Sequence, residues 1–152
     1  MSAATKSEPE DMEAARIAAL AKHLECEADE LSVNGHDEYL VEHSRREYLV
    51  MTDSEADERA GEYIRESLWA FNASFIIDHS KLPTDAEEMV KSFQQDKCEG
   101  ANETIEALIE DMEEFVSDAI SADGRAHFLN TYDDEEHEIK TDAGLFYVYR
   151  VQ

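Results

Sequence analysis

The sequence predicts a helix-rich α+β protein with about four helices and a small antiparallel sheet. Three observations support this. Short β-prone runs lie at 39–41, 48–51 and 145–151, apolar residues recur at helical spacing elsewhere, and capping-box motifs precede helical stretches. A chain of 152 residues fits a single domain, 1–152.

The first helix is predicted to begin at Ser7-Glu8-Pro9-Glu10, a capping box with an early proline. Leu20 and Leu24 belong to its apolar face, and it should end near Glu25. We expect residues 1–7 to be frayed.

The sheet is predicted from a hairpin and the C-terminal strand. The runs 39–41 and 48–51 flank His43–Arg46, which favours a hairpin. The run 145–151 is the best strand candidate and should pair with this hairpin. Residues 133–142 are expected to form an acidic loop that ends at Gly144.

A second capping box, Thr52-Asp53-Ser54-Glu55, predicts one long helix that reaches residue 77. The half from 68 to 77 is apolar on nearly all sides and should be the central core helix. Its apolar face contains Ala60, Tyr63, Ile64, Ser67, Leu68, Phe71 and Phe75.

Two further helices follow Pro83. Thr84-Asp85-Ala86-Glu87 should cap a helix that carries Met89, Val90 and Phe93 and stops before Gly100. A continuous helix is then predicted from Asn102 to about Ile120, and Asp123-Gly124 ends it. Its apolar stripe is Ile105, Leu108, Ile109, Met112, Phe115 or Val116, and Ala119.

The charge is the most informative feature of the composition. There are 38 acidic against 13 basic residues, which gives a formal net charge of −25. Nucleic acids and anionic membranes select basic surfaces, so neither is expected as a direct partner. The sequence has no signal-peptide pattern and no membrane-length apolar run, which favours the cytoplasm.

The acidic residues gather where basic ones are missing. Between Cys98 and Gly124 there are nine Asp or Glu residues and no Lys or Arg. On a continuous helix, the acids of 103–114 would lie at roughly one charge per 3 Å, close to the phosphate spacing of a DNA strand. This row predicts a partner-binding surface formed by Glu103, Glu106, Glu110, Asp111, Glu113, Glu114 and Asp118.

A second acidic run, Asp133, Asp134, Glu135 and Glu136, is expected to extend this surface. With His137 it could alternatively bind a cation, although it does not match an EF-hand loop. For both runs the other interpretation is an ordinary solvated face. Arg125, a lone base in this region, should hold local carboxylates.

No catalytic, cofactor-binding or metal-binding residue is predicted. The sequence contains no P-loop, dinucleotide fingerprint, H-E-x-x-H or G-x-S-x-G motif. His127 has no visible nucleophile or metal partner. Cys26 and Cys98 lack metal or redox spacing and are interpreted as reduced thiols, with a single disulfide left open.

Several segments resemble a family of small acidic proteins encoded by bacteriophages. They are Tyr48–Asp57, Tyr63–Ile76, Ser121–Leu129 and Phe146–Arg150. The resemblance covers about two thirds of the chain. It implies a phage product in the host cytoplasm, where small acidic proteins often inhibit restriction, CRISPR, repair, gyrase or transcription machinery.

The leading hypothesis is therefore an inhibitor that presents DNA-like charge to a basic, nucleic-acid-binding host protein. One alternative is a halophile-type acidic domain, and another is a metal-binding protein or enzyme with an unrecognised site. The sequence is compatible with a monomer or a homodimer.

Overall fold

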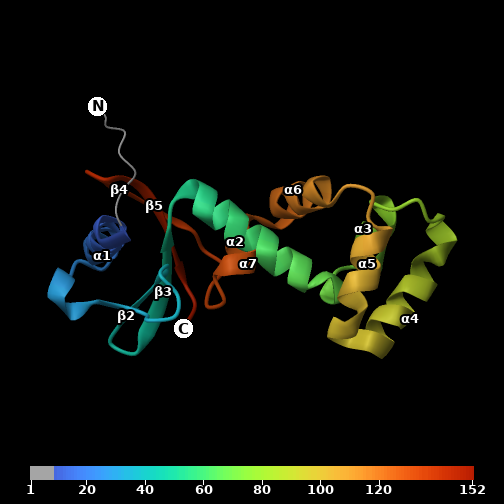
Figure 1. Cartoon of the computed structure of the whole chain (residues 1–152), viewed down its shortest axis with the longest axis horizontal. Helices are drawn as coiled ribbons and strands as arrows, with labels where there is room; N and C mark the ends of the chain where they lie inside the picture. Colours follow the sequence, from blue (N-terminus) through green and yellow to red (C-terminus); the bar gives the residue numbers. More distant parts are fainter. Residues whose placement is uncertain (1–8) are drawn as a thin grey trace. The chain divides into compact units, whose positions relative to one another are not determined.

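The computed structural model describes residues 9–152 (Figure 1). The capping box at Ser7 and the expected frayed segment 1–7 lie outside the described residues. The chain divides into two compact units: residues up to Asp57 together with Arg125–Gln152, and Glu58–Gly124. No linker in the sequence marks the first boundary, because it falls inside a helix.

The first unit contains the sheet. Its elements, with η for a 3₁₀ turn, are α1 (Pro9–Leu24), η1 (Ala28–Glu30), β1 (Ser32–Val33), β2 (Leu40–His43), β3 (Arg46–Met51), the start of α2 (Asp53–Glu66), α7 (Arg125–Leu129), β4 (His137–Thr141) and β5 (Gly144–Arg150). The five strands follow the order β1-β2-β3-β5-β4, and every neighbouring pair is antiparallel. The predicted α+β class is confirmed.

The predicted hairpin is confirmed as β2 and β3. Its two-residue turn is Ser44-Arg45, and both residues have positive φ, 49° and 70°. Positive φ at both central positions matches the right-handed twist of a tight hairpin. The predicted C-terminal strand is also confirmed, because β5 pairs with β3 and places Val148 opposite Val50.

The expected loop over 133–142 is wrong for residues 137–141, which form the edge strand β4. His137, Ile139 and Thr141 are half-buried, whereas the residues between them are exposed. This alternation is a strand signal. The charged residues on the outer face, Glu138 and Lys140, made the segment resemble an acidic loop.

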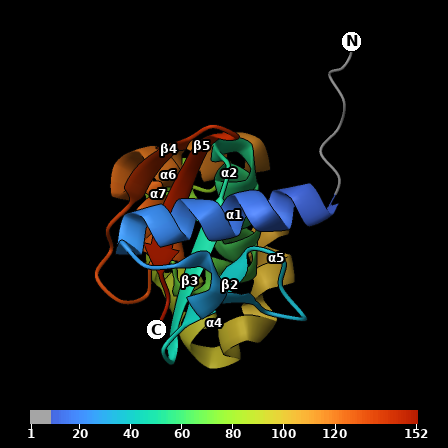
Figure 2. The ribbon, with the colours of Figure 1, turned by 90° about the vertical axis from the view of Figure 1, so that its left-hand side faces the viewer.

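Helix α1 lies across one face of the sheet (Figure 2). Its buried residues Ala19 and Leu20 join a core with Val41, Val50 and Phe146. The opposite face is buried as well, and α7 contacts β5 there. Cys26 is a free thiol in this unit, and Cys98 is a free thiol in the other, as predicted.

The second unit is helical. Its elements are the rest of α2, η2 (Leu68–Ala70), α3 (Ala73–Asp78), η3 (Thr84–Ala86), α4 (Glu87–Lys97), η4 (Cys98–Ala101), α5 (Asn102–Leu108) and α6 (Met112–Asp123). Its fully buried side chains include Ile64, Leu68, Ile76, Ile105 and Phe115. The predicted helix after Pro83 is confirmed as α4, which buries Val90 but leaves Met89 exposed.

The prediction of one helix from Asp53 to residue 77 is wrong. Its capping box forms, since the Thr52 N–H donates to Glu55 and the Glu55 N–H donates to the Thr52 hydroxyl. However, α2 ends at Glu66, and α3 begins after Asn72, whose side chain accepts the Ser74 N–H at 2.9 Å. An N-cap of this kind starts a new helix.

Distant side chains stabilise this break. Asn102 accepts the Trp69 N–H at 2.9 Å and donates to the Glu66 carbonyl at 2.6 Å. The Gln94 amide donates to the carbonyls of Leu68 and Phe71, at 3.1 and 2.7 Å. These bonds replace the helical ones that the break removes, so the interrupted backbone stays satisfied.

The substitution Gln94→Leu is expected to lower the free energy of unfolding by about 1–3 kcal/mol. Leucine fits a buried position, but it leaves the carbonyls of Leu68 and Phe71 without this donor. Urea denaturation followed by circular dichroism measures the change. Exposed Gln95→Leu is the control and should change stability by less than about 0.5 kcal/mol. Equal effects of the two substitutions would contradict this account of the break.

The prediction of one helix from Asn102 to Ile120 is also wrong. Helix α5 ends at Leu108, and Ile109 is extended and forms an isolated bridge with Ser80. The Asp111 side chain then caps α6 by accepting the Glu114 N–H at 3.1 Å. The two helices are separate, so the acids of 103–114 do not form a straight row at phosphate spacing.

Candidate functional site

Five carboxylates and one histidine line a pocket in the second unit. Its volume is about 420 Å³. The lining residues come from α3 and the residue after it, and from the first two turns of α6 with the segment before it. They are Phe75, Asp78, His79, Glu110, Asp111, Glu114 and Asp118, and we call this site the acidic pocket.

The break between α5 and α6 positions one wall of the acidic pocket. The Glu110 N–H donates to the His79 carbonyl at 2.9 Å, next to the bridge between Ser80 and Ile109. This backbone pairing fixes Glu110 beside the end of α3. The interruption that removes the predicted acidic row therefore brings some of its carboxylates together with residues about 30 positions earlier.

His79 connects the carboxylates to an aromatic cluster. Its ring centroid lies 4.9 Å from that of Phe75 and 5.2 Å from that of Phe115. Its Nε2 lies 3.3 Å from Oδ2 of Asp118. The imidazole is 12% exposed, so it is held by packing rather than free in solvent. Part of the pocket lining is thus aromatic and packed against the core residue Phe115.

The electrostatics of the acidic pocket favour a cationic occupant. None of its lining residues is Lys or Arg. The neighbouring Lys81 places Nζ 4.0 Å from Oε1 of Glu110, but its side chain is 87% exposed, so this contact is weak. A guanidinium or ammonium would gain several charge-assisted hydrogen bonds and could lie against the Phe75 ring.

A second, more apolar groove adjoins the acidic pocket. It has a volume of about 540 Å³ and shares Glu110 with that pocket. Its lining residues are Lys81, Leu82, Ala107, Leu108, Ile109 and Glu110, and we call it the apolar groove. Together the two hollows give one surface of the second unit an apolar and an acidic part.

The structure places only part of the predicted acidic surface at this site. Glu110, Asp111, Glu114 and Asp118 line the acidic pocket. Glu103, Glu106 and Glu113 are exposed but do not line it. The sequence interpretation missed Phe75, Asp78 and His79, because they were assigned to, or placed after, a continuous core helix. No local pattern connects them with residues 110–118.

The second acidic run lies in the first unit. Asp133, Asp134, Glu135 and Glu136 are all exposed. Asp133 accepts the Glu135 N–H at 3.1 Å, which is a local loop contact. Glu136 differs from the other three, because its carboxylate accepts bonds from Arg125 and from the Tyr149 hydroxyl. Its carboxylate, although exposed, is engaged in bonds within the protein.

Arg125 holds three carboxylates; Glu136 is local, as predicted, whereas Asp53 and Asp57 come from a distant part of the sequence. Its Nη1 lies 2.8 Å from Asp53 Oδ1 and 3.0 Å from Asp57 Oδ1, and its Nε lies 3.0 Å from Glu136 Oε1. Burial opposes the charge of Arg125, but these partners outweigh it and raise the guanidinium pKa further above its usual range. Burial and Glu136 likewise raise the pKa of the Tyr149 hydroxyl. The donors and acceptors of this network satisfy each other, which is typical of a structural site.

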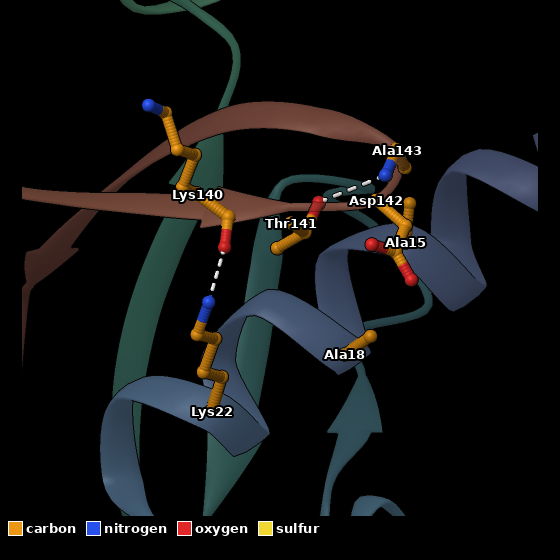
Figure 3. A pocket seen from close by; sticks show the side chains of 7 residues that line it. All are labelled: Ala15, Ala18, Lys22, Lys140, Thr141, Asp142 and Ala143. Atoms are coloured by element: carbon orange, nitrogen blue, oxygen red, sulfur yellow. Dashed lines mark hydrogen bonds between the residues drawn. The ribbon is translucent and has the colours of Figure 1, made fainter.

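The first unit has a groove of its own, shown in Figure 3. It has a volume of about 560 Å³ and is lined by Ala15, Ala18, Lys22, Lys140, Thr141, Asp142 and Ala143. The Lys22 ammonium donates to the Lys140 carbonyl at 2.5 Å. The Lys140 side chain points away from Lys22 (Figure 3). The two ammonium groups therefore do not converge on one anion.

Residues 9–152 contain no group of three or more His, Cys, Asp and Glu side chains placed to hold a metal ion. Within the same range no helix has the length and apolar character needed to cross a membrane. Comparisons of the chain with models of protein families, with curated proteins and with solved structures found no match. The candidate site therefore depends on the geometry and charge of its own residues.

Proposed function

We propose that this protein is an acidic interaction protein whose acidic pocket binds a basic side chain of a nucleic-acid-binding partner. The observation that carries the proposal is the lining of that pocket, with five carboxylates and neither Lys nor Arg. Such a site repels nucleic acid and attracts guanidinium and ammonium groups.

The charge of the whole chain supports the same class of partner. A formal net charge of −25 creates a negative potential that steers basic proteins toward it at low salt. Proteins that bind nucleic acid carry basic surfaces, and the same surface can accept dense carboxylates. The protein would then occupy the surface that the nucleic acid uses.

The biological context of the proposal is inhibition of a host enzyme. Segments such as Tyr63–Ile76 resemble small acidic phage proteins, which makes a bacterial defence, repair or transcription protein the proposed target. In this proposal a compact acidic pocket takes the place of a straight DNA-like row of charges. The protein competes for a few basic residues rather than for a whole DNA-binding groove.

The test is affinity capture from a bacterial lysate with the tagged protein, at low and at moderate salt, followed by mass spectrometry. We expect one dominant nucleic-acid-binding protein, which added duplex DNA displaces because both ligands use the same basic surface. Its recovery should fall as salt screens the charges. A captured partner that duplex DNA does not displace would contradict competition for that surface, and the absence of any specific partner would overturn the proposal.

A further inference from the structure

We infer that the partner inserts a segment in which an apolar side chain lies close to an arginine, with the apolar side chain in the apolar groove and the guanidinium in the acidic pocket. This inference rests on the proposed function and deepens it. The two hollows share Glu110, so one short segment can fill both.

The apolar groove exists because α5 ends early. Ala107 and Leu108 form the last turn of α5, and Ile109 leaves the helix in an extended conformation to pair with Ser80. Ile109 is nearly buried, Leu108 and Leu82 are half-buried, and Ala107 is exposed. The groove therefore presents apolar side-chain area beside the charged groups of Lys81 and Glu110. An aliphatic side chain would cover that apolar area and gain free energy from its removal from water.

Charge complementarity decides which segment fits this surface. An aliphatic side chain alone would fill the groove but bring no positive charge to the five carboxylates of the acidic pocket. An acidic segment would be repelled, and a small free cation would not use the groove. A segment with both an apolar and a basic side chain satisfies both parts of the surface.

Arginine fits the acidic pocket better than lysine does. Its planar guanidinium can bond two carboxylates at once and stack on an aromatic ring, whereas an ammonium is a compact and strongly hydrated charge. The pocket offers both kinds of partner, because carboxylates such as Glu114 share its lining with the rings of Phe75 and His79. His79 itself contacts Asp118, so a carboxylate and an aromatic ring lie next to each other there.

The test uses ¹⁵N-labelled protein and synthetic twelve-residue peptides, with one leucine and one arginine separated by one to four residues. Two matched sets replace the leucine with serine or the arginine with citrulline, its uncharged analogue. At moderate salt we expect the best leucine–arginine peptide to bind at least about tenfold more tightly than the corresponding serine peptide or the corresponding citrulline peptide. Amide shifts should include Leu108 and Ile109 together with Glu114 and Asp118.

A variant that fills the apolar groove tests directly whether the leucine of the peptide binds there. Ala107 is exposed on α5, so Ala107→Gln should fold normally, occupy the groove and remove the preference for leucine over serine. Exposed Ala122→Gln on α6 is the matched control and should keep that preference.

The outcomes separate the inference from the proposed function. Equal binding of the leucine and serine peptides, with shifts confined to the acidic pocket, would overturn the inference and leave the proposed function standing. Equal binding of the arginine and citrulline peptides would overturn both, because the pocket would then not select a cation. The absence of binding by every arginine peptide would likewise overturn both the inference and the proposed function.

Discussion

Replacing Glu55 with glutamine is expected to lower the free energy of unfolding by about 3 kcal/mol. Glu55 accepts two bonds from Arg16, at 2.8 and 3.0 Å, and Arg16 is only 4% exposed. Glutamine keeps the shape and one acceptor oxygen but removes the negative charge. Arg16 is then left as a buried cation with no carboxylate partner, which is among the most costly changes a folded protein can undergo.

The effect of Glu55→Gln should depend on pH. Burial acts to raise the pKa of Glu55, but Arg16 and Thr52 outweigh burial and hold it below the ordinary value of 4.5. A carboxyl with a depressed pKa contributes its full stability above its unfolded-state pKa. That stability is lost as the pH falls through the folded-state pKa. The difference in unfolding free energy between wild type and variant should therefore be constant near neutral pH. It should shrink once the pH falls below the ordinary pKa of a glutamate side chain.

Urea denaturation of both proteins across a pH series measures this difference. Exposed Glu58→Gln, on the same helix, removes an equal charge and should show little change at any pH. A loss that is the same at neutral and at strongly acidic pH would mean that the ion pair does not cause it.

Replacing Arg125 with methionine is expected to lower the free energy of unfolding by about 2–3 kcal/mol. The guanidinium is 11% exposed, lies over the Tyr147 ring and bonds Asp53, Asp57 and Glu136. Methionine keeps much of the aliphatic packing. However, the three carboxylates lose their common partner and repel each other in a chain that is already strongly negative.

A charge-matched control separates the network from the change in net charge. Arg65→Met removes one exposed arginine and should cost less than about 0.5 kcal/mol. Urea denaturation at low and at moderate salt compares the two variants. Similar losses for both, or a loss for Arg125→Met that salt abolishes completely, would show that net charge rather than this network is responsible.

The parts of the fold that local patterns determine could be predicted from the sequence. The capping box at Thr52 needs only residues three positions apart, and the hairpin and the strand β5 follow from β-prone runs and a short turn. The capping box and the hairpin turn depend on residues close together in the chain, and β5 is a strongly β-prone run that pairs with both β3 and β4. The local sequence therefore contains most of the relevant information.

The two helix breaks could not be predicted in the same way. The stripe through Leu68 and Phe75 has helical spacing, yet Gln94 and Asn102 supply hydrogen bonds that make an interrupted backbone as well satisfied as a continuous one. At Ile109 the deciding contact is the bridge to Ser80. In both places tertiary contacts outweigh local helix preference.

The candidate site depends on these same breaks. The excess of acidic residues between Cys98 and Gly124 is visible in the sequence, and Glu110, Glu114 and Asp118 were predicted from it. Which acids converge could not be predicted, because the break at 109–111 selects them and the end of α3 supplies the opposite wall. His79 has no motif of its own, since its role follows from where α3 ends.

The most direct test of the acidic pocket compares two triple variants as baits in the same lysate capture. The pocket variant carries Glu110→Gln, Glu114→Gln and Asp118→Asn. The control carries Glu103→Gln, Glu106→Gln and Glu113→Gln, which removes three charges from exposed residues that do not line the pocket. Thermal melts first establish that both variants fold.

We expect the pocket variant to bind the captured partner at least about 30-fold more weakly than wild type, because three charge-assisted contacts are lost. The affinity of the control variant should stay within about threefold of wild type. Removing charges outside the pocket weakens only the long-range attraction, which salt screens. Equal losses in the two variants would mean that total negative charge, rather than the pocket, binds the partner. Unchanged binding of the pocket variant would contradict the proposed site altogether.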